Sequence, residues 1–242
     1  MRIVEFAKAL AQLVNMKSWG PFTDASNESK FDFSFTISWS QGAEDLALVK
    51  LFENLPQGRY IDVGAHHPSR FSVTRKLYQR GWSGVNIEAN PKLMSEFMIK
   101  RPKDVNLNFA VGLNKIYSLA VFEEAALSTI SPEWEQKFVD EKNVLAGHIQ
   151  VPGITLTEIQ NLYGRGQSFD LLTIDAEGSD LEVIKSFDFE NIDSRLYPKF
   201  VMIETPPGLS NVLAMPIAGF LTLNGYELWM VLPMSSIFKF VS

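Results

Sequence analysis

The 242-residue chain contains no cysteine. It therefore has no disulfide, no thiolate nucleophile and no zinc site with cysteine ligands. Small secreted domains often depend on disulfides, so this absence argues against that class of protein. A cytoplasmic location is the simplest interpretation.

The chain also lacks an excess of basic residues. It has 22 lysines and arginines against 28 aspartates and glutamates, which gives a formal net charge of −6. Proteins that bind nucleic acids usually gather Lys and Arg into a patch that contacts phosphate groups, and the sequence has no such cluster. The composition predicts no nucleic-acid partner and favours a small molecule or a neutral polymer as substrate.

Long hydrophobic runs are missing as well. The first residues, "MRIVEFAKALAQLVNM", carry apolar side chains at helical spacing, but Glu5 and Lys8 interrupt them. This pattern predicts an amphipathic helix and no transmembrane segment. Such a helix packs more often on its own domain or on a partner subunit than on a membrane surface. The sequence therefore leaves open whether the protein forms a homo-oligomer.

The rest of the chain is organised as alternating strands and helices. Residues 1–40 are predicted to form the N-terminal helix and a connecting segment, and residues 41–242 one α/β domain. Strands are expected in 59–65, 83–89 and 105–112, with helices in 42–55, 72–81 and 91–102. Three strand–helix units in a row predict a parallel sheet.

The second half of the chain continues this pattern and then changes. Residues 117–125, 169–178 and 199–205 are predicted strands, and residues 131–142, 155–164, 179–187 and 209–222 are predicted helices. The last two strands, 226–232 and 237–242, are close enough in sequence to form an antiparallel hairpin. The predicted fold is a doubly wound, mostly parallel seven-stranded sheet that ends in this hairpin. Sheets of this kind are typical of S-adenosylmethionine-dependent methyltransferases, whereas nicotinamide-binding sheets usually stay parallel.

Two acidic residues and a glycine follow the first two strands of the domain. Asp62 and Gly64 end the first strand, and Glu88 ends the second, 24 residues after Gly64. In a doubly wound sheet, ligands bind beyond the carboxyl ends of the strands. The glycine lets backbone approach a cofactor, and a carboxylate at the position of Glu88 can accept hydrogen bonds from both ribose hydroxyls.

Further carboxylates follow two later strands. Asp175 and Glu177 stand in "TIDAEGSD", and Glu204 ends "VMIE". At the mouth of a cleft, Asp175 could orient a sulfonium group or take a proton from a substrate hydroxyl. Three carboxylates at neighbouring strand ends also match a site for Mg²⁺ or Ca²⁺, and this alternative stays open.

Two adjacent histidines, His66 and His67, follow the first strand and precede Pro68. Proline fixes its own φ angle and favours an extended conformation at His67, which stiffens the turn. One histidine is expected to pack or form hydrogen bonds within the turn, and the other to face the substrate cleft as a proton acceptor. Side chains of neighbouring residues in an extended segment diverge, which disfavours joint binding of one metal ion.

Six motifs occur in an order and spacing that resemble one known family: "YIDVGA", "NIEANP", "NFAVG", "LST", "TIDAEGSDLEVIKSF" and "VMIE". Over about residues 38–206 the chain resembles the FkbM-type S-adenosylmethionine-dependent methyltransferases. Members of that family mostly methylate hydroxyl groups of sugars and of polyketide-type natural products. Many of them have "DVGANIG" where this chain has "DVGAHHP", so the backbone path of the turn is expected to differ.

The resemblance implies roles for particular residues. It places Asp62, Gly64 and Ala65 at the methionine part of the cofactor, Glu88 at the ribose, Asn108 and Ala110 beside the adenine, and Asp175, Glu177 and Gly178 at the edge of the reaction cleft.

The sequence thus predicts a methyltransferase domain over residues 41–242 that transfers a methyl group to a hydroxyl of a sugar, glycan or related natural product. His66, His67 and Asp175 are the candidate bases. One alternative is a nicotinamide-dependent oxidoreductase or epimerase, although the chain lacks G-x-G-x-x-G after the first strand and a Tyr-x-x-x-Lys pair. The other is a non-catalytic binding protein that retains the fold, an alternative supported by the altered turn alone.

Overall fold

A computed structural model describes residues 36–241 of the chain, which divides into two compact units between Ile37 and Ser38. The predicted helix near the N-terminus and most of the connecting segment lie outside the described residues, so the proposed boundary at residue 40 stays a prediction. Everything below concerns the second unit. Within the described part of the chain, no helix is both long and apolar enough to cross a membrane.

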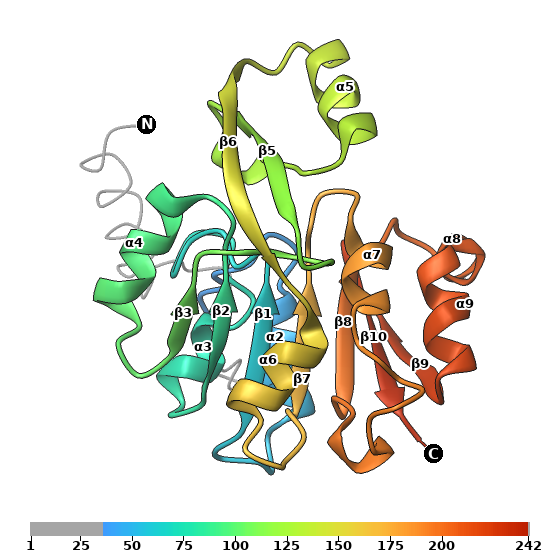
Figure 1. Cartoon of the computed structure of the whole chain (residues 1–242). Coiled ribbons are helices and arrows are strands. Elements are labelled where there is room, and N and C mark those ends of the chain that lie inside the picture. The colour runs from blue at the N-terminus through green and yellow to red at the C-terminus, as the bar shows by residue number, and fades with distance from the viewer. Residues whose placement is uncertain (1–35, 242) are drawn as a thin grey trace, which may run out of the picture. The chain divides into compact units, whose positions relative to one another are not determined.

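A seven-stranded sheet forms the centre of this unit (Figure 1). Five strands are parallel to one another, and the last two are antiparallel to their neighbours, which confirms the predicted doubly wound sheet and terminal hairpin. Across the sheet the strands are β3 (Val105–Leu107), β2 (Ser83–Ile87), β1 (Arg59–Val63), β7 (Leu171–Ile174), β8 (Phe200–Glu204), β10 (Ser235–Phe240) and β9 (Tyr226–Val231).

Helices cover both faces of the sheet because alternate residues of the buried strands point to opposite sides. On one face Tyr60 of β1 and Leu171 of β7 pack with Leu48 of α2 (Glu44–Leu51) and Leu77 of α3 (Arg75–Gln79). On the other face the adjacent strand residues pack against α6 (Leu156–Tyr163), α7 (Asp180–Lys185) and α9 (Pro216–Leu223). This arrangement leaves the carboxyl ends of the parallel strands at one edge.

Helix starts follow the sequence signals. Asn90 caps α4 (Pro91–Lys100), where its side chain accepts a hydrogen bond from the Lys92 backbone N–H. Ser131 likewise caps α5 (Pro132–Asp140), and proline occupies the first position of both helices. A proline there loses no helical hydrogen bond, because the first N–H groups of a helix have no partner within it.

The predicted helix over 209–222 is wrong in one respect, since it consists of two helices. These are α8 (Leu209–Ala214) and α9, separated by Met215 in an extended conformation. Pro216 follows Met215, and a residue before proline is disfavoured in the helical region. The remaining short elements are the 3₁₀ helices η3 (Ala125–Leu127) and η4 (Ser194–Leu196).

The middle of the chain departs most from the predicted pattern. The predicted strand over 105–112 is split, because β3 joins the main sheet while β4 (Ala110–Val111) pairs with β6 (Leu145–Ile154). The ten-residue strand β6 was not predicted, and it pairs antiparallel with β5 (Ile116–Phe122). Residues 116–154, which contain β5, α5 and β6, extend beyond the carboxyl edge of the sheet (Figure 1). They are called the cap lobe below.

Candidate active site

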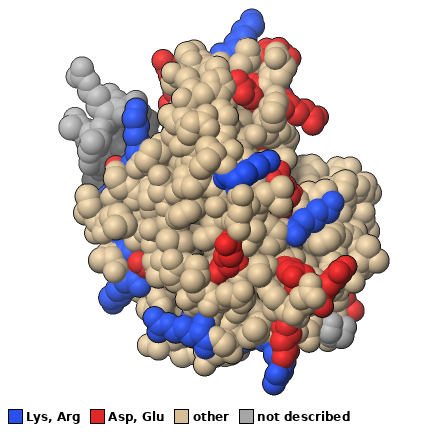
Figure 2. Space-filling model, in the orientation of Figure 1, with Lys and Arg blue, Asp and Glu red and all other residues tan. Residues whose placement is uncertain are grey.

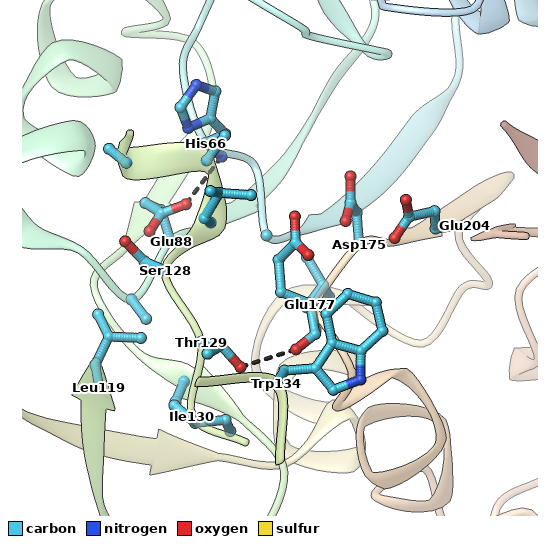
Figure 3. A pocket seen from close by; sticks show the side chains of 18 of the residues that line it. His66, Glu88, Leu119, Ser128, Thr129, Ile130, Trp134, Asp175, Glu177 and Glu204 are labelled. Atoms are coloured by element: carbon cyan, nitrogen blue, oxygen red, sulfur yellow. Dashed lines mark hydrogen bonds between the residues drawn. The ribbon is translucent and has the colours of Figure 1, made fainter. Parts of the chain in front are cut away.

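A pocket of about 370 Å³ lies where the carboxyl ends of the parallel strands meet the cap lobe (Figure 3). Its volume is in the range of sites that enclose a small molecule. One end is built from the ends of β1 and β2 and from β4, and the other from the ends of β7 and β8 together with α5. These are called the Glu88 end and the acidic end.

Glu88 is buried at the first of these ends, where two backbone groups fix its carboxylate. The Asn90 N–H donates to Oε1 at 2.7 Å, and the His66 N–H donates to Oε2 at 2.9 Å. Burial raises the pKa of Glu88 to about 7, although these two hydrogen bonds oppose the shift. Each carboxylate oxygen has a second lone pair, so Glu88 can accept two further hydrogen bonds from a ligand.

Asn108 supports this end without lining it. Its side-chain amide donates to the carbonyl oxygens of Glu88 and Ala89, both at 2.8 Å. Its neighbours Phe109 and Ala110 do line the pocket, together with Ala89. Asn108 thus positions the Glu88 backbone, and the three neighbouring side chains give this end an apolar wall.

Gly64 occupies the turn after β1, where only glycine fits. Its φ angle is +70°, and a Cβ atom at this position would lie 1.7 Å from the carbonyl oxygen of Asp175. The two strand ends therefore approach each other more closely than any side chain permits. Gly64 lines the main pocket and also a smaller cavity beneath it.

Asp62 and Ala65 line only the smaller cavity. The Asp62 carboxylate is buried and accepts hydrogen bonds from the hydroxyls of Thr74 at 2.6 Å and Thr173 at 2.7 Å. Burial raises its pKa. Asp62 thus joins β1 to β7 and to the segment before α3, and it holds Gly64 in place between them.

The two histidines point in different directions, as the sequence predicted. His67 turns back into the loop, where its Nδ1 accepts hydrogen bonds from the backbone N–H groups of Ser69 and Arg70. His66 lines the pocket in a left-handed conformation with φ of 52°, and its ring stacks on Phe71. Burial and the nearby Arg70 lower the pKa of His66 to about 4, so the imidazole is neutral at physiological pH.

Three carboxylates meet at the acidic end of the pocket (Figure 3), and these are Asp175, Glu177 and Glu204. Asp175 is exposed, yet the surrounding protein and the charges of Glu204 and Glu177 raise its pKa well above its usual range. Desolvation and Glu204 raise the pKa of Glu177 to about 8, against a weaker opposing effect of Lys137. Carboxylates this close hold protons that isolated ones would lose.

The same three residues were the candidates for a divalent cation. Within residues 36–241, no group of three or more histidine and carboxylate side chains is arranged to hold a metal ion. The Asp180 carboxylate accepts a hydrogen bond from the Ala176 N–H at 2.9 Å. That contact stabilises the loop at the start of α7, as expected for an acidic residue at a helix N-terminus.

The cap lobe supplies pocket residues for which the sequence gave no role. Residues 125–130 form one wall, and Trp134 and Lys137 of α5 reach the acidic end. The Ser128 hydroxyl is buried in this wall without a hydrogen-bond partner among the described residues. The sequence offered one signal for this segment, the motif "LST" at residues 127–129.

Two contacts fasten this wall to the sheet. Arg70 in the turn after β1 makes two hydrogen bonds to the carboxylate of Glu124, at 2.9 and 2.8 Å. On the other side, the Thr129 hydroxyl donates to the Glu177 carbonyl oxygen at 2.8 Å (Figure 3). The first pair is about half exposed, whereas Thr129 is buried, so the Arg70–Glu124 contact is the weaker fastening.

The pocket fits a nucleoside cofactor with a charged tail. Its Glu88 end combines unused acceptor capacity with an apolar wall, and two polar atoms at the pocket, Ser128 Oγ and His66 Nδ1, are buried without partners in the described residues. Buried polar groups rarely stay unpaired, so both atoms suit a ligand that supplies hydrogen bonds.

The comparison with known protein families agrees with this geometry. The model of the FkbM methyltransferase domain matches residues 62–228. No curated protein sequence matches the chain.

Several solved structures are similar to this one at low sequence identity. Precorrin-6y C5,15-methyltransferase from Geobacter metallireducens GS-15 is 15% identical with a TM-score of 0.42, over 89% of this chain and 96% of that one. A TehB-like S-adenosylmethionine-dependent methyltransferase from Corynebacterium glutamicum is 11% identical with a TM-score of 0.40, over 99% and 100% of the two chains. A human methyltransferase 10 domain containing protein is also 11% identical with a TM-score of 0.40, over 98% and 97%.

The family assignment rests on the FkbM match, which spans well over half of the chain and begins at Asp62, near the end of β1. The carboxylates and the glycine turn at the strand ends fall within it, as does the whole cap lobe. The chain belongs to the FkbM family of methyltransferases, a family that implies S-adenosylmethionine as the methyl donor.

Proposed function

We propose that this protein is an S-adenosylmethionine-dependent O-methyltransferase that acts on a hydroxyl group of a sugar, a glycan or a related natural product. The observation that carries the proposal is the continuity of one pocket from Glu88 to the carboxylates of Asp175 and Glu204. A cofactor held at the first end would present its reactive group toward the second.

At the Glu88 end, the Glu88 carboxylate would accept hydrogen bonds from the ribose hydroxyls, and Ala89, Phe109 and Ala110 would contact the adenine. Gly64 would leave room for the methionine part, while Asp62 and Ala65 hold the turn around it. When bound, the cofactor supplies an electrophilic methyl group on a sulfonium. The carboxylates at the acidic end favour this cation, because a positive charge stabilises their ionised form.

At the acidic end, the protein has to align the acceptor oxygen with the methyl group and remove the hydroxyl proton. Asp175 is the leading base, since it lines the pocket beside Glu204 and, once a bound cation favours its ionised form, its raised pKa makes it a stronger proton acceptor than an ordinary aspartate. During transfer, the Asp175 carboxylate would accept the proton of the acceptor hydroxyl, and the bound cofactor would supply the methyl group and keep the electron pair of its carbon–sulfur bond.

His66 is the second candidate base, because its ring lines the pocket and is neutral near pH 7. A pKa near 4 makes it a weak proton acceptor, which favours Asp175. The geometry disfavours His67, whose Nδ1 already accepts two backbone hydrogen bonds and whose Nε2 lies 3.5 Å from Glu96.

Two proposals rest on composition: that the protein has no nucleic-acid partner, and that it is located in the cytoplasm. On the face drawn in Figure 2, Lys and Arg side chains stand apart from one another and are interspersed with acidic ones, which supports the proposal that no nucleic acid is bound. A homo-oligomer and a divalent cation remain open proposals as well.

Methyl transfer tests the proposed reaction. Purified full-length protein is incubated with cofactor labelled in its methyl group and with neutral sugars, nucleotide sugars and glycan extracts, and the products are analysed by mass spectrometry. We expect a mass increase of one methylene unit on an acceptor hydroxyl. Methylation of nitrogen or carbon would correct the class of acceptor, and NAD reduction without methyl transfer would favour the oxidoreductase alternative.

A further inference from the structure

Trp134 stands out among the pocket residues that the proposed reaction leaves without a role. It lies in the first turn of α5, is partly buried, and lines the acidic end beside Glu177 (Figure 3). Gly178, the residue after Glu177, packs against the indole so closely that a Cβ there would lie 2.1 Å from Cδ1 of the ring. The loop that carries the acidic residues is thus shaped around this side chain.

The indole is held in a fixed orientation. The Lys137 ammonium sits 3.8 Å from the ring centroid, and Phe138 meets the ring edge-on with centroids 5.5 Å apart. The Trp134 backbone N–H donates to the Ser131 hydroxyl that caps α5. A preorganised aromatic ring loses little conformational entropy when a ligand packs on it.

The charge of this end favours a neutral ligand. Lys137 is the only lysine or arginine among the described residues that line the pocket, and it already occupies the cation position over Trp134. An anionic ligand would be repelled by the carboxylates of Glu177 and Glu204, and the Lys137 ammonium alone would offset that repulsion. The raised pKa of Glu177 means that it holds a proton over much of the physiological range, so it can donate as well as accept hydrogen bonds.

We propose that Trp134 is the acceptor-specificity residue of this methyltransferase: the C–H face of a neutral, polyhydroxylated ring stacks on the indole face turned away from Lys137, while Glu177 and Glu204 bind its hydroxyls. The electron-rich face of an indole attracts the positively polarised C–H groups of such a ring. This inference rests on the proposed function, because it assigns the acceptor to the acidic end and the cofactor to the Glu88 end.

The chain offers a matched control in Trp229. Like Trp134, it carries a lysine over its ring, with Lys239 Nζ 4.5 Å from the centroid, but it is half exposed on β9 and does not line the pocket. A change at Trp229 therefore reports the general effect of removing an indole with its lysine contact.

Saturation-transfer difference NMR tests the inference directly. Protein loaded with S-adenosylhomocysteine is mixed with methyl α-D-glucopyranoside, methyl α-L-rhamnopyranoside, glucosamine or glucose 6-phosphate. We expect saturation transfer to the ring C–H protons of the neutral glycosides, and weaker transfer to the charged sugars. Trp134→Ala should weaken binding of the best neutral glycoside by about 5- to 50-fold, the scale of losing an aromatic contact and its buried area.

Trp229→Ala should leave this binding unchanged, and Trp134→Phe should retain part of it while keeping the packing against Phe138. Circular dichroism melting confirms that each variant is folded. Equal binding in Trp134→Ala and Trp229→Ala, preference for a charged sugar, or no transfer to any of the four sugars would overturn the inference. Failure of the proposed function has a different signature, because S-adenosylhomocysteine itself would then not bind in calorimetry.

Discussion

The two ends of the pocket are built in different ways. At the Glu88 end, hydrogen bonds between neighbouring strands and backbone donors to the Glu88 carboxylate set the positions of the groups. At the acidic end, side chains come from the loop after β7, from the last residue of β8 and from a helix of the cap lobe. The first end is fixed by the sheet, whereas the second depends on the cap lobe, which extends beyond the sheet.

The largest effect is expected from a change at the acidic end. Asp175→Asn keeps the size of the side chain but removes a proton acceptor, and turnover should fall by about 10²- to 10⁴-fold. Binding of S-adenosylhomocysteine should change little. Steady-state kinetics and calorimetry on the same preparation check both expectations, with Glu190→Gln, an exposed carboxylate outside the pocket, as the matched control.

The pH dependence separates the two candidate bases. If Asp175 is the base, turnover should fall at acid pH with an apparent midpoint above the usual range of aspartate, because its pKa is raised and it titrates together with Glu204 and Glu177. His66→Gln should leave the profile nearly unchanged. A midpoint near pH 4 that disappears in His66→Gln would identify His66 as the base instead.

A smaller effect is expected at the Glu88 end. Glu88→Ala removes a charged hydrogen-bond acceptor, which should weaken S-adenosylhomocysteine binding by about 1–3 kcal/mol, or roughly 5- to 150-fold. Because Glu88 also accepts the N–H groups of His66 and Asn90, the variant should melt at a lower temperature. Unchanged affinity in the folded variant would exclude Glu88 from the cofactor site.

This contrast explains how much of the protein could be predicted from its sequence. Runs of buried residues bounded by turns identified the strands of the main sheet, and their order placed Glu88, Asp175 and Glu204 at one edge. The sequence also predicted that one of the two histidines lies within the turn and the other faces the cleft, but not which one. These features depend on local pattern and on the general geometry of parallel sheets.

The cap lobe could not be predicted in the same way. The strand β6 contains Gly147, Pro152 and Gly153, which are strand breakers in most contexts, and it is stabilised by pairing with β5 and β4. Gly153 approaches the backbone carbonyl of Leu113, a contact that no local pattern encodes. Trp134 and Lys137 reach the pocket only because β5 and β6 carry α5 there.

The roles of Asp62 and Asn108 also depended on tertiary contacts. Both residues stood at plausible ligand positions in the sequence, but hydrogen bonds to Thr74, Thr173 and the Glu88 backbone occupy their side chains. Sequence position identifies the strand end at which a polar residue lies. It does not identify which neighbour that residue binds.

The acidic end should also make stability depend on pH. The pKa of Glu177 is about 8 in the folded protein and near 4.5 in an unfolded chain, so between these values the folded state binds more protons. Its stabilising contribution is complete below about pH 4 and is lost as pH rises through about 8. Glu177→Gln should therefore raise the melting temperature at pH 8.5 by a few degrees and leave it unchanged at pH 4.5. Equal shifts at both pH values would contradict the assigned pKa.

The smallest effect is expected at the Arg70–Glu124 contact, which holds the wall of residues 125–130 against the Glu88 end. Removing the exposed Arg70–Glu124 pair with Glu124→Gln should cost about 0.2–1 kcal/mol, so S-adenosylhomocysteine should dissociate a few times faster in stopped-flow experiments. The difference should vanish in 1 M salt, which screens the pair in the wild-type protein. A difference that persists at high salt would show that Glu124 acts through packing.

Calorimetric titration of the wild-type protein with S-adenosylhomocysteine and with NAD tests the central claim most directly. The account predicts saturable binding of one S-adenosylhomocysteine per chain, weakened in Glu88→Ala, and no binding of NAD. Binding of NAD alone, or of neither compound, would contradict a pocket built to hold the methyl donor between Glu88 and Asp175.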